Sequence, residues 1–247
     1  LGVNTKFYFD EWSKNKRGLK RLMWVPQSTI KIISLIRKHS PDVVDVSAGH
    51  GYLLMLLYKL FPNRPVFIMR SHGLEAQVWE IWKKYNLMKN MSWRWKVYYR
   101  LWRMKEVEWS IKLADGVIVP TEEQKEYLIR KNMKSEDEIF VIPHGVDDIF
   151  FQAGEKNDTH FRLLWVGGWT EIKNPLLFLR AMEIIWKKGF PIPVAIVGVG
   201  EAENKVWKEV KSDYHKFVSV FPKVSKETLR SLYLSHSVFV HTSLYEG

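Results

Sequence analysis

Short apolar runs alternate with longer segments of helical periodicity along most of this 247-residue chain. The runs are continuous stretches of Val, Ile, Leu and Phe, which is typical of strands buried on both faces of a parallel sheet. The predicted strands are Val43–Ser47, Val66–Arg70, Gly116–Pro120, Ile139–Pro143, Leu163–Gly167, Val194–Gly198, Val218–Phe221 and Val238–His241. The predicted helices are Thr29–Lys38, Leu53–Leu60, Glu75–Lys112, Glu122–Lys131, Pro175–Lys188, Ala202–Ser212 and Lys226–Ser235. This alternation predicts a doubly wound α/β fold of mostly parallel sheets flanked by helices.

The chain is long enough for two α/β domains. A polar segment without periodicity, FFQAGEKNDTH at 150–160, separates two βα series. We therefore expect a first domain at 1–150, a linker at 151–158 and a second domain at 159–247. A hydrophobic content of 46% allows each domain a core of its own.

Positive charge is concentrated in one segment. The formal net charge is +11, and Ile81–Lys105 holds eight basic residues and no acidic one. Such a segment attracts polyanions, which include nucleic acid, anionic lipid headgroups and phosphorylated substrates. No nucleic-acid motif accompanies the charge, so nucleic acid is not an expected partner.

The chain contains no cysteine, which removes thiolate nucleophiles and cysteine-ligated metals and fits a reducing compartment. No apolar run approaches the ~20 residues that span a bilayer, and the sequence has no signal-peptide pattern. We expect a cytoplasmic location, with peripheral attachment to the cytoplasmic membrane face as an alternative.

Six motifs follow one another in a fixed order. They are Arg70–Gly73 (RSHG), Ala114–Thr121 (ADGVIVPT), Val141–Asp147 (VIPHGVD), Leu163–Pro175 (LLWVGGWTEIKNP), Ala195–Glu201 (AIVGVGE) and Leu232–Gly247, which closes with SLYEG. Together they resemble the family-four retaining glycosyltransferases (glycosyl transferases group 1). That resemblance runs from about Pro41 to the last residue. It implies a GT-B fold of two Rossmann-like domains and transfer of a sugar from a nucleotide-sugar donor with retention of configuration.

The resemblance places the donor in the second domain. Gly167 and Gly168 would let the backbone approach a phosphate, and Lys173 would neutralise the diphosphate leaving group. Gly198 and Gly200 would border the nucleotide, and Val224 would lie near the nucleobase. A solvated surface role is the alternative for Lys173. The family usually carries Arg where Gly168 stands, so one of two expected phosphate-binding cations is missing.

The end of the chain carries the other donor-binding candidates. By resemblance, Glu246 contacts hydroxyls of the donor sugar, with Ser243 and Gly247 beside it. The family has a second Glu eight residues after this one, beyond the end of the sequence. Glu246 follows the final predicted strand, at the edge where α/β proteins bind ligands.

Among the histidines, His72 follows the strand Val66–Arg70, and the resemblance places it on the acceptor side. Histidine exchanges protons near neutral pH. A backbone-bonded His at a strand end is the alternative. His50 is a weaker candidate, and His144 is expected to be structural. His236 and His241 show no metal-ligand spacing, so neither a metal nor a cofactor is expected.

The segment 93–105 (WRWKVYYRLWRMK) mixes basic and aromatic residues. On a helix, Lys96, Arg100 and Arg103 would share one face and form a membrane or anion patch. The predicted aromatic face comprises Met91, Trp95, Tyr98 and Trp102. The alternative is an aromatic stripe that packs into the core beside a solvated basic side.

The predicted function is a glycosyltransferase acting on a sugar, lipid-linked or polysaccharide acceptor. One alternative is a non-catalytic nucleotide- or anion-binding remnant of the same fold, and another is a basic protein of the membrane surface. The family's opening βα unit and its closing helices find no match. We therefore expect a chain truncated at both ends and impaired in catalysis.

Overall fold

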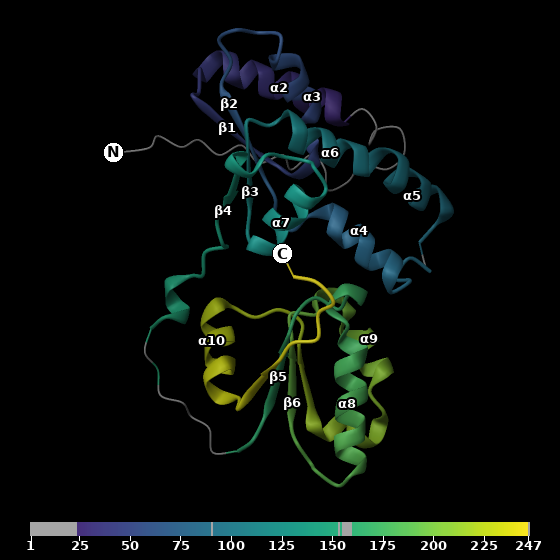
Figure 1. Cartoon of the computed structure of the whole chain (residues 1–247). Helices are drawn as coiled ribbons and strands as arrows, with labels where there is room; N and C mark the ends of the chain where they lie inside the picture. Colours follow the sequence, from purple (N-terminus) through teal and green to yellow (C-terminus); the bar gives the residue numbers. More distant parts are fainter. Residues whose placement is uncertain (1–23, 90, 153, 155–159, 247) are drawn as a thin grey trace. The chain divides into compact units, whose positions relative to one another are not determined.

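The computed structural model describes residues 24–89, 91–152, 154 and 160–246. They form two compact units, the first comprising 24–79 and 91–143 and the second 80–89, 144–152, 154 and 160–246. The predicted linker 151–158 falls within the second unit, and most of it lies outside the described residues. Figure 1 shows the elements of both units in chain order.

The first unit is built on a parallel sheet in the order β1-β2-β3-β4. Its elements are α2 (Trp24–His39), β1 (Val43–Ser47), η2 (Ala48–Gly51), α3 (Tyr52–Tyr58), β2 (Val66–Arg70), the start of α4 (Glu75–Lys84), α5 (Trp93–Tyr98), η3 (Tyr99–Arg103), α6 (Met104–Leu113), β3 (Gly116–Val119), α7 (Glu122–Arg130), η4 (Glu136–Glu138) and β4 (Ile139–Val141). Its core joins the sheet to α3, α6 and α7, with fully buried side chains at Leu54, Phe67, Ile111 and Leu128. The side chain of Thr121 begins α7 by accepting from Gln124 N, as the sequence predicts.

The second unit has a parallel sheet in the order β7-β6-β5-β8. Its elements are η5 (Asp148–Phe150), β5 (Leu163–Val166), η6 (Glu171–Lys173), α8 (Pro175–Lys187), β6 (Val194–Val197), η7 (Gly200–Ala202), α9 (Glu203–Glu209), η8 (Ser212–Phe217), β7 (Val218–Phe221), α10 (Lys226–Ser235) and β8 (Val238–Val240). All eight predicted strands are confirmed, although several end one or two residues earlier than predicted.

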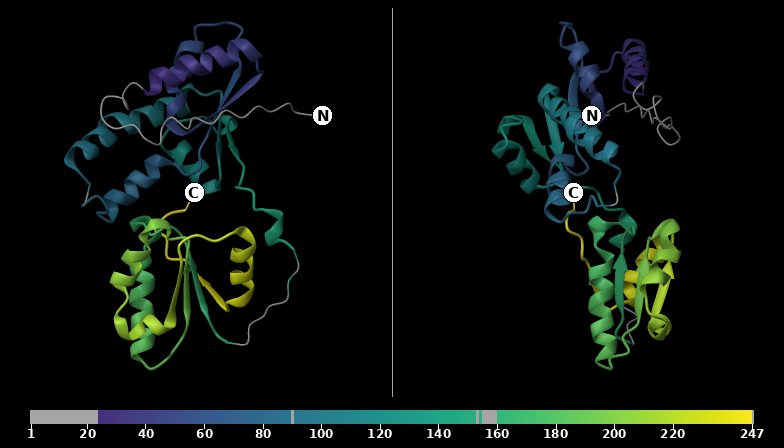
Figure 2. Two further views of the ribbon diagram at one scale, coloured as in Figure 1. Left: turned by 180° about the vertical axis from the view of Figure 1, so that it is seen from behind. Right: turned by 90° about the vertical axis from the view of Figure 1, so that its right-hand side faces the viewer.

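Helices cover both faces of this second sheet. Leu163 and Trp165 face a core that includes residues of α8 and α9, whereas the intervening Leu164 belongs to a cluster with Leu229 and Leu232 of α10. Because neighbouring strand residues point to opposite faces, one strand feeds both cores. Figure 1 and the views in Figure 2 show α8 and α10 on opposite sides of the sheet. The predicted doubly wound arrangement is confirmed here.

The single helix predicted over Glu75–Lys112 is wrong. Helix α4 ends at Lys84, and Asn86 takes a left-handed conformation with φ 53°. Leu87 N then donates to the carbonyl of Trp82, which closes the helix end. A new helix begins after Ser92, whose side chain accepts a hydrogen bond from Trp95 N. The apolar periodicity continues across this break, so it could not reveal the left-handed turn.

Candidate functional site

The order of strands creates a switch point in the second sheet. Chain connections place β6 and β7 on one side of β5, and β8 on the other. Ligands of open α/β sheets bind outside the carboxyl ends of the strands at such a point. The loops after β5 and β8 are therefore the candidate binding elements of this unit.

These two loops are bonded to each other. Thr242 Oγ1 donates to the carbonyl oxygen of Lys173 at 2.9 Å and accepts from Trp165 Nε1 at 3.1 Å. Leu244 N donates to the carbonyl oxygen of Ile172 at 2.8 Å. The buried Trp165 ring thus fixes the loop after β8 against the loop after β5.

An ion pair joins the side chains of Lys173 and Glu246 across these loops. Lys173 Nζ lies 2.6 Å from each carboxylate oxygen of Glu246. His241 Nε2 lies 2.7 Å from Glu246 Oε1. Lys173 and Glu246 are predicted for this site from the sequence. His241 is not, because its spacing was compared only with that of metal ligands. The usable signal was its position at the end of the last predicted strand, five residues before Glu246.

The Glu246 carboxylate is held in its charged form. Partial burial raises its pKa, but hydrogen bonds from Lys173, Ser243 and His241 outweigh that effect, and the pKa lies below the ordinary glutamate value. Near neutral pH the site therefore presents a cation and a carboxylate side by side, both partly exposed.

Two glycine turns meet at the same edge of the sheet. Gly167 N donates to the carbonyl oxygen of Val197 at 2.9 Å, and Gly198 has φ 87°. A Cβ added at Gly198 would lie 3.6 Å from the carbonyl oxygen of Gly167. The two glycine turns are therefore in van der Waals contact, with the side chains of Trp165 and Lys173 beside Gly167. Glycine turns of this kind can admit a phosphate to the backbone. Gly200 follows with φ 57°, and its N–H is bonded to the carbonyl of Pro222.

The remaining predicted donor residues have different surroundings. Gly168 borders open space, because a Cβ there would meet only Thr170 Cγ2, at 3.9 Å. Val224 is half-buried and packs its side chain against the cluster on the α10 face. Ser243 is a hydrogen-bond partner of Glu246. Gly247 lies outside the described residues.

In the first unit, His72 is exposed just beyond the carboxyl end of β2. Ser47 and Arg70 are register partners at the ends of β1 and β2. The loops that carry His50 and His72 therefore leave the sheet at the same edge.

Arg103 does not belong to a surface patch, and that prediction is wrong. It is 8% exposed and donates to Glu75 Oε1 at 2.5 Å, to Glu106 Oε2 at 3.1 Å and to His50 Nδ1 at 3.2 Å. Residues Tyr99–Arg103 form a π-helical turn, which shifts the helical frame and turns Arg103 inward. Arg100 is exposed and Lys96 is half-buried, so those two members of the predicted patch remain near the surface.

Glu106 is the most buried acid of this cluster, at 2% exposure. Burial raises its pKa, and the hydrogen bonds from Arg103 and Trp102 only partly offset this, so the pKa lies above the ordinary glutamate value. Because Arg103 can only donate, His50 Nδ1 must be the acceptor in their hydrogen bond.

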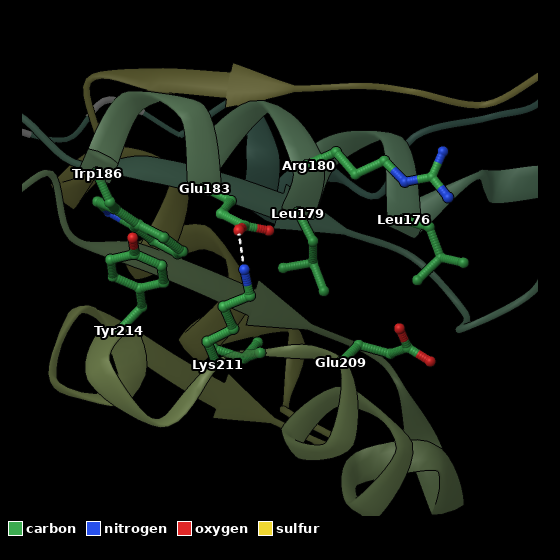
Figure 3. A pocket seen from close by; sticks show the side chains of 9 residues that line it. Leu176, Leu179, Arg180, Glu183, Trp186, Glu209, Lys211 and Tyr214 are labelled. Carbon is green, nitrogen blue, oxygen red and sulfur yellow. Dashed lines mark hydrogen bonds and ion pairs between the residues drawn. The ribbon is translucent and has the colours of Figure 1, made fainter. Parts of the chain in front are cut away.

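A pocket of about 160 Å³ lies elsewhere in the second unit, between α8 and the segment that follows α9. Figure 3 shows Trp186 and Tyr214 at one end and Arg180 and Glu209 at the other. Glu183 pairs with Lys187 and with Lys211 beside it, and these two bonds lower its pKa to about 2. The pocket is lined by none of the predicted donor-binding residues.

Within 24–89, 91–152, 154 and 160–246, no group of three or more His, Asp or Glu side chains is placed to hold a metal ion. In the same residues no helix combines the length and the apolar character that crossing a bilayer requires.

Two family models together match almost the whole chain. The model of Glycosyltransferase Family 4 matches residues 9–149, and the model of Glycosyl transferases group 1 matches residues 146–247. The match begins at residue 9, well before Pro41, where the sequence resemblance was expected to start.

Curated relatives are similar at low identity. An uncharacterized glycosyltransferase of Methanocaldococcus jannaschii is 24% identical, with 97% of this chain and 58% of that protein covered. The capsular polysaccharide biosynthesis glycosyltransferase CapM of Staphylococcus aureus is 23% identical, with 90% and 57% covered. The chain thus spans somewhat more than half the length of these relatives.

Solved structures share the fold. A sucrose-phosphate synthase of Thermosynechococcus elongatus aligns with a TM-score of 0.70 at 16% identity and covers 95% of this chain and 58% of its own. The catalytic domain of starch synthase IV of Arabidopsis thaliana, bound to ADP and acarbose, aligns with a TM-score of 0.58 at 11% identity and covers 94% and 58%. The architecture is that of GT-B glycosyltransferases.

Proposed function

The chain belongs to glycosyltransferase family 4, and on that premise we propose that its second unit binds a nucleotide-sugar donor for transfer to an acceptor. The observation that carries this proposal is the ion pair of Lys173 and Glu246 at the switch point of the sheet. A nucleotide sugar combines a diphosphate with a hydroxylated ring. A lysine and a carboxylate side by side match both parts, because one attracts phosphate and the other accepts from hydroxyls.

In the proposed reaction, the bond between the anomeric carbon and the diphosphate oxygen breaks while the acceptor oxygen bonds to that carbon. The acceptor hydroxyl proton passes to the departing diphosphate. Lys173 stabilises the charge that develops on the leaving group. Attack on the face that the diphosphate leaves retains the configuration, which is the outcome that the family resemblance implies. Because Lys173 supplies positive charge, we propose transfer that needs neither a metal nor a cofactor.

We propose that His72, in the first unit, serves the acceptor. Its exposed ring follows the carboxyl end of β2, where α/β units bind ligands. The acceptor class that we propose is a sugar, a lipid-linked sugar or a polysaccharide, and the similarity to a capsular polysaccharide enzyme supports it. We place the reaction in the cytoplasm, at a membrane surface that the basic segment Ile81–Lys105 would meet.

A second candidate is a nucleotide- or anion-binding module without transferase activity. Gly168 favours it, because one cation that the family usually supplies is absent at that position. Such a module would bind a nucleoside diphosphate through Lys173 but would not turn over a donor.

Calorimetry with UDP, GDP and ADP tests the binding step, and release of nucleotide from the corresponding glucose donors tests the chemistry. The transferase predicts that one nucleotide binds best and that its sugar donor is consumed. Binding without consumption would support the module instead. If no nucleotide bound at millimolar concentration, both the transferase and the nucleotide-binding module would be refuted.

A further inference from the structure

The helical segment from α5 through η3 to α6 carries an exposed apolar stripe. Trp93, Val97 and Leu101 are 69%, 46% and 65% exposed. Trp93 and Val97 are four residues apart in α5 and share one face of that helix, and Leu101 is exposed in the π-helical turn that follows. Large apolar side chains gathered in a row on a surface mark an interaction site.

Basic side chains border this stripe. Half-buried Lys96 adjoins Val97 in the chain, and exposed Arg100 adjoins Leu101. Arg94 adjoins Trp93, with its guanidinium 5.6 Å from the Trp93 ring. No acidic residue occurs in Ile81–Lys105. The face thus has an apolar centre and a cationic border.

Arg103 pairs with two carboxylates inside the first unit. Arg103 turns inward at the π-helical turn and pairs with Glu75 and Glu106. Both carboxylates are therefore held by Arg103 within the unit, and its single positive charge balances one of their two negative charges. Arg103 is therefore not available at the surface of the segment, whereas Arg94, Lys96 and Arg100 remain near the surface.

We propose that the stripe face, defined by Trp93, Val97, Leu101, Arg94, Lys96 and Arg100, docks on an anionic lipid bilayer. An interfacial helix places its apolar residues at the boundary of headgroups and acyl chains, with Lys and Arg on the lipid phosphates. RNA is the competing polyanion. It would use the same cations and could stack on Trp93, but Val97 and Leu101 offer no ring for a base. The apolar centre therefore favours lipid.

This inference deepens the proposed function and rests on it, since it gives the acceptor-side unit a membrane partner. Docking itself needs no turnover. It is therefore tested by co-sedimentation of the full chain with vesicles of phosphatidylcholine alone and of an equimolar mixture with phosphatidylglycerol. The expected result is binding to the anionic vesicles and little binding to the neutral ones.

Two double variants separate the apolar from the electrostatic contribution to vesicle binding. Trp93→Ala with Leu101→Ala should lower partitioning into anionic vesicles by roughly tenfold or more, because the apolar contribution is lost. Lys96→Gln with Arg100→Gln should lower it about 25-fold, since each basic residue near such a surface contributes roughly fivefold. A matched control is Leu177→Ala with Ile184→Ala on α8, whose side chains are 52% and 56% exposed. That control should partition like the parent chain.

The outcomes distinguish the proposals. Equal binding to both vesicle types, or no loss on Trp93→Ala with Leu101→Ala, overturns the docking inference. Tighter binding of polyuridylate than of anionic vesicles at the same salt overturns it in favour of RNA. Nucleotide binding by the same variants is measured by calorimetry. Intact nucleotide binding without vesicle binding refutes only the docking. Vesicle binding without nucleotide binding leaves the docking standing and refutes the transferase and the nucleotide-binding module.

Discussion

Lys173 Nζ lies 2.6 Å from both carboxylate oxygens of Glu246, although the two residues are 73 positions apart in the chain. Lys173 follows β5 and Glu246 follows β8, the two strands that flank the switch point of the sheet. A surface ion pair of this kind contributes little to stability, typically ~0–1 kcal/mol. Its position at the ligand-binding edge therefore points to binding rather than to folding.

Replacing Lys173 by Ala is expected to weaken nucleoside diphosphate binding by about 30- to 150-fold, because a charged hydrogen-bond donor to phosphate contributes roughly 2–3 kcal/mol. The free energy of unfolding should change by less than ~1 kcal/mol, since both side chains are partly exposed. Calorimetry with the best-binding nucleotide and urea unfolding measure the two effects.

Lys187→Ala is the matched control for that variant. Lys187 also pairs with a glutamate, Glu183 on the same helix. It is not one of the predicted donor-binding residues, so nucleotide binding should stay at the parent value. If Lys173→Ala and Lys187→Ala lost nucleotide affinity equally, the cause would be general electrostatic attraction. The donor site would then have to be placed elsewhere.

The site of the second unit was predictable from the sequence because it depends on strand order and on strand ends. Continuous apolar runs identify the strands, although the edge strands β1 and β8 are half-buried or exposed and not buried on both faces as expected. Parallel strands bring the residues that follow them to one edge, which is where Lys173 and Glu246 lie. The contribution of His241 was missed, because its partner is set by the path of a loop. The place of Val224 near the nucleobase stays a prediction, and its half-buried side chain packs against the cluster on the α10 face.

The interior of the first unit was less predictable. The periodicity of Glu75–Lys112 contains no mark of the left-handed Asn86 or of the π-helical turn at Tyr99–Arg103. One extra residue in that turn decides whether Arg103 faces solvent or Glu106. Spacing arguments assume a regular helix, and they fail where the helical frame shifts.

Replacing Arg103 by Met is expected to lower the free energy of unfolding by ~3–5 kcal/mol, because it leaves Glu106 buried without its charge partner. Combining it with Glu106→Gln should restore part of the loss. Urea unfolding of both variants and the parent at pH 7 measures this. A double variant no more stable than the single one would contradict the role given to the buried charge.

The loss in Arg103→Met should shrink as the pH falls from 7 toward 5. Burial raises the pKa of Glu106 above that of an unfolded glutamate even with Arg103 present. The folded state therefore binds a proton more readily than the unfolded state, and lowering the pH favours folding. Without Arg103 this effect grows, so the difference from the parent should narrow in that window. If the difference in the free energy of unfolding between the parent and Arg103→Met stayed constant or widened toward pH 5, the proposed protonation of buried Glu106 would be refuted.

The ionised carboxylate of Asp115 stabilises the first unit at pH values above its pKa. Arg64 contacts its two carboxylate oxygens at 2.6 Å each, and Phe67 N donates to it at 2.8 Å. These bonds, that of Arg64 foremost, lower the pKa of Asp115 despite partial burial. Its stabilisation is therefore fully present above about pH 4 and is lost as the pH falls through the folded value.

Asp115→Asn should consequently cost about 1–3 kcal/mol at pH 7 and progressively less below about pH 4, as followed by urea unfolding across that range. Asp45→Asn is the control, because Asp45 pairs with Arg70 on the same sheet but at greater exposure. Its cost should stay below ~1 kcal/mol. If the two variants lost the same stability, the paired hydrogen bonds of Asp115 with Arg64 and its bond from Phe67 N would not be the cause.

Gly168→Arg is expected to tighten nucleoside diphosphate binding by roughly tenfold, because a guanidinium forms paired hydrogen bonds with phosphate oxygens. The family usually carries Arg at this position, five residues before Lys173. The backbone admits a side chain here, since φ is not positive and a Cβ would meet only Thr170 Cγ2 at 3.9 Å. Gly168→Met, of similar length and without charge, should bring no gain in calorimetry. If Arg and Met variants bound the nucleotide equally, the phosphate would not lie beside Gly168, and the donor would have to be placed differently on this edge.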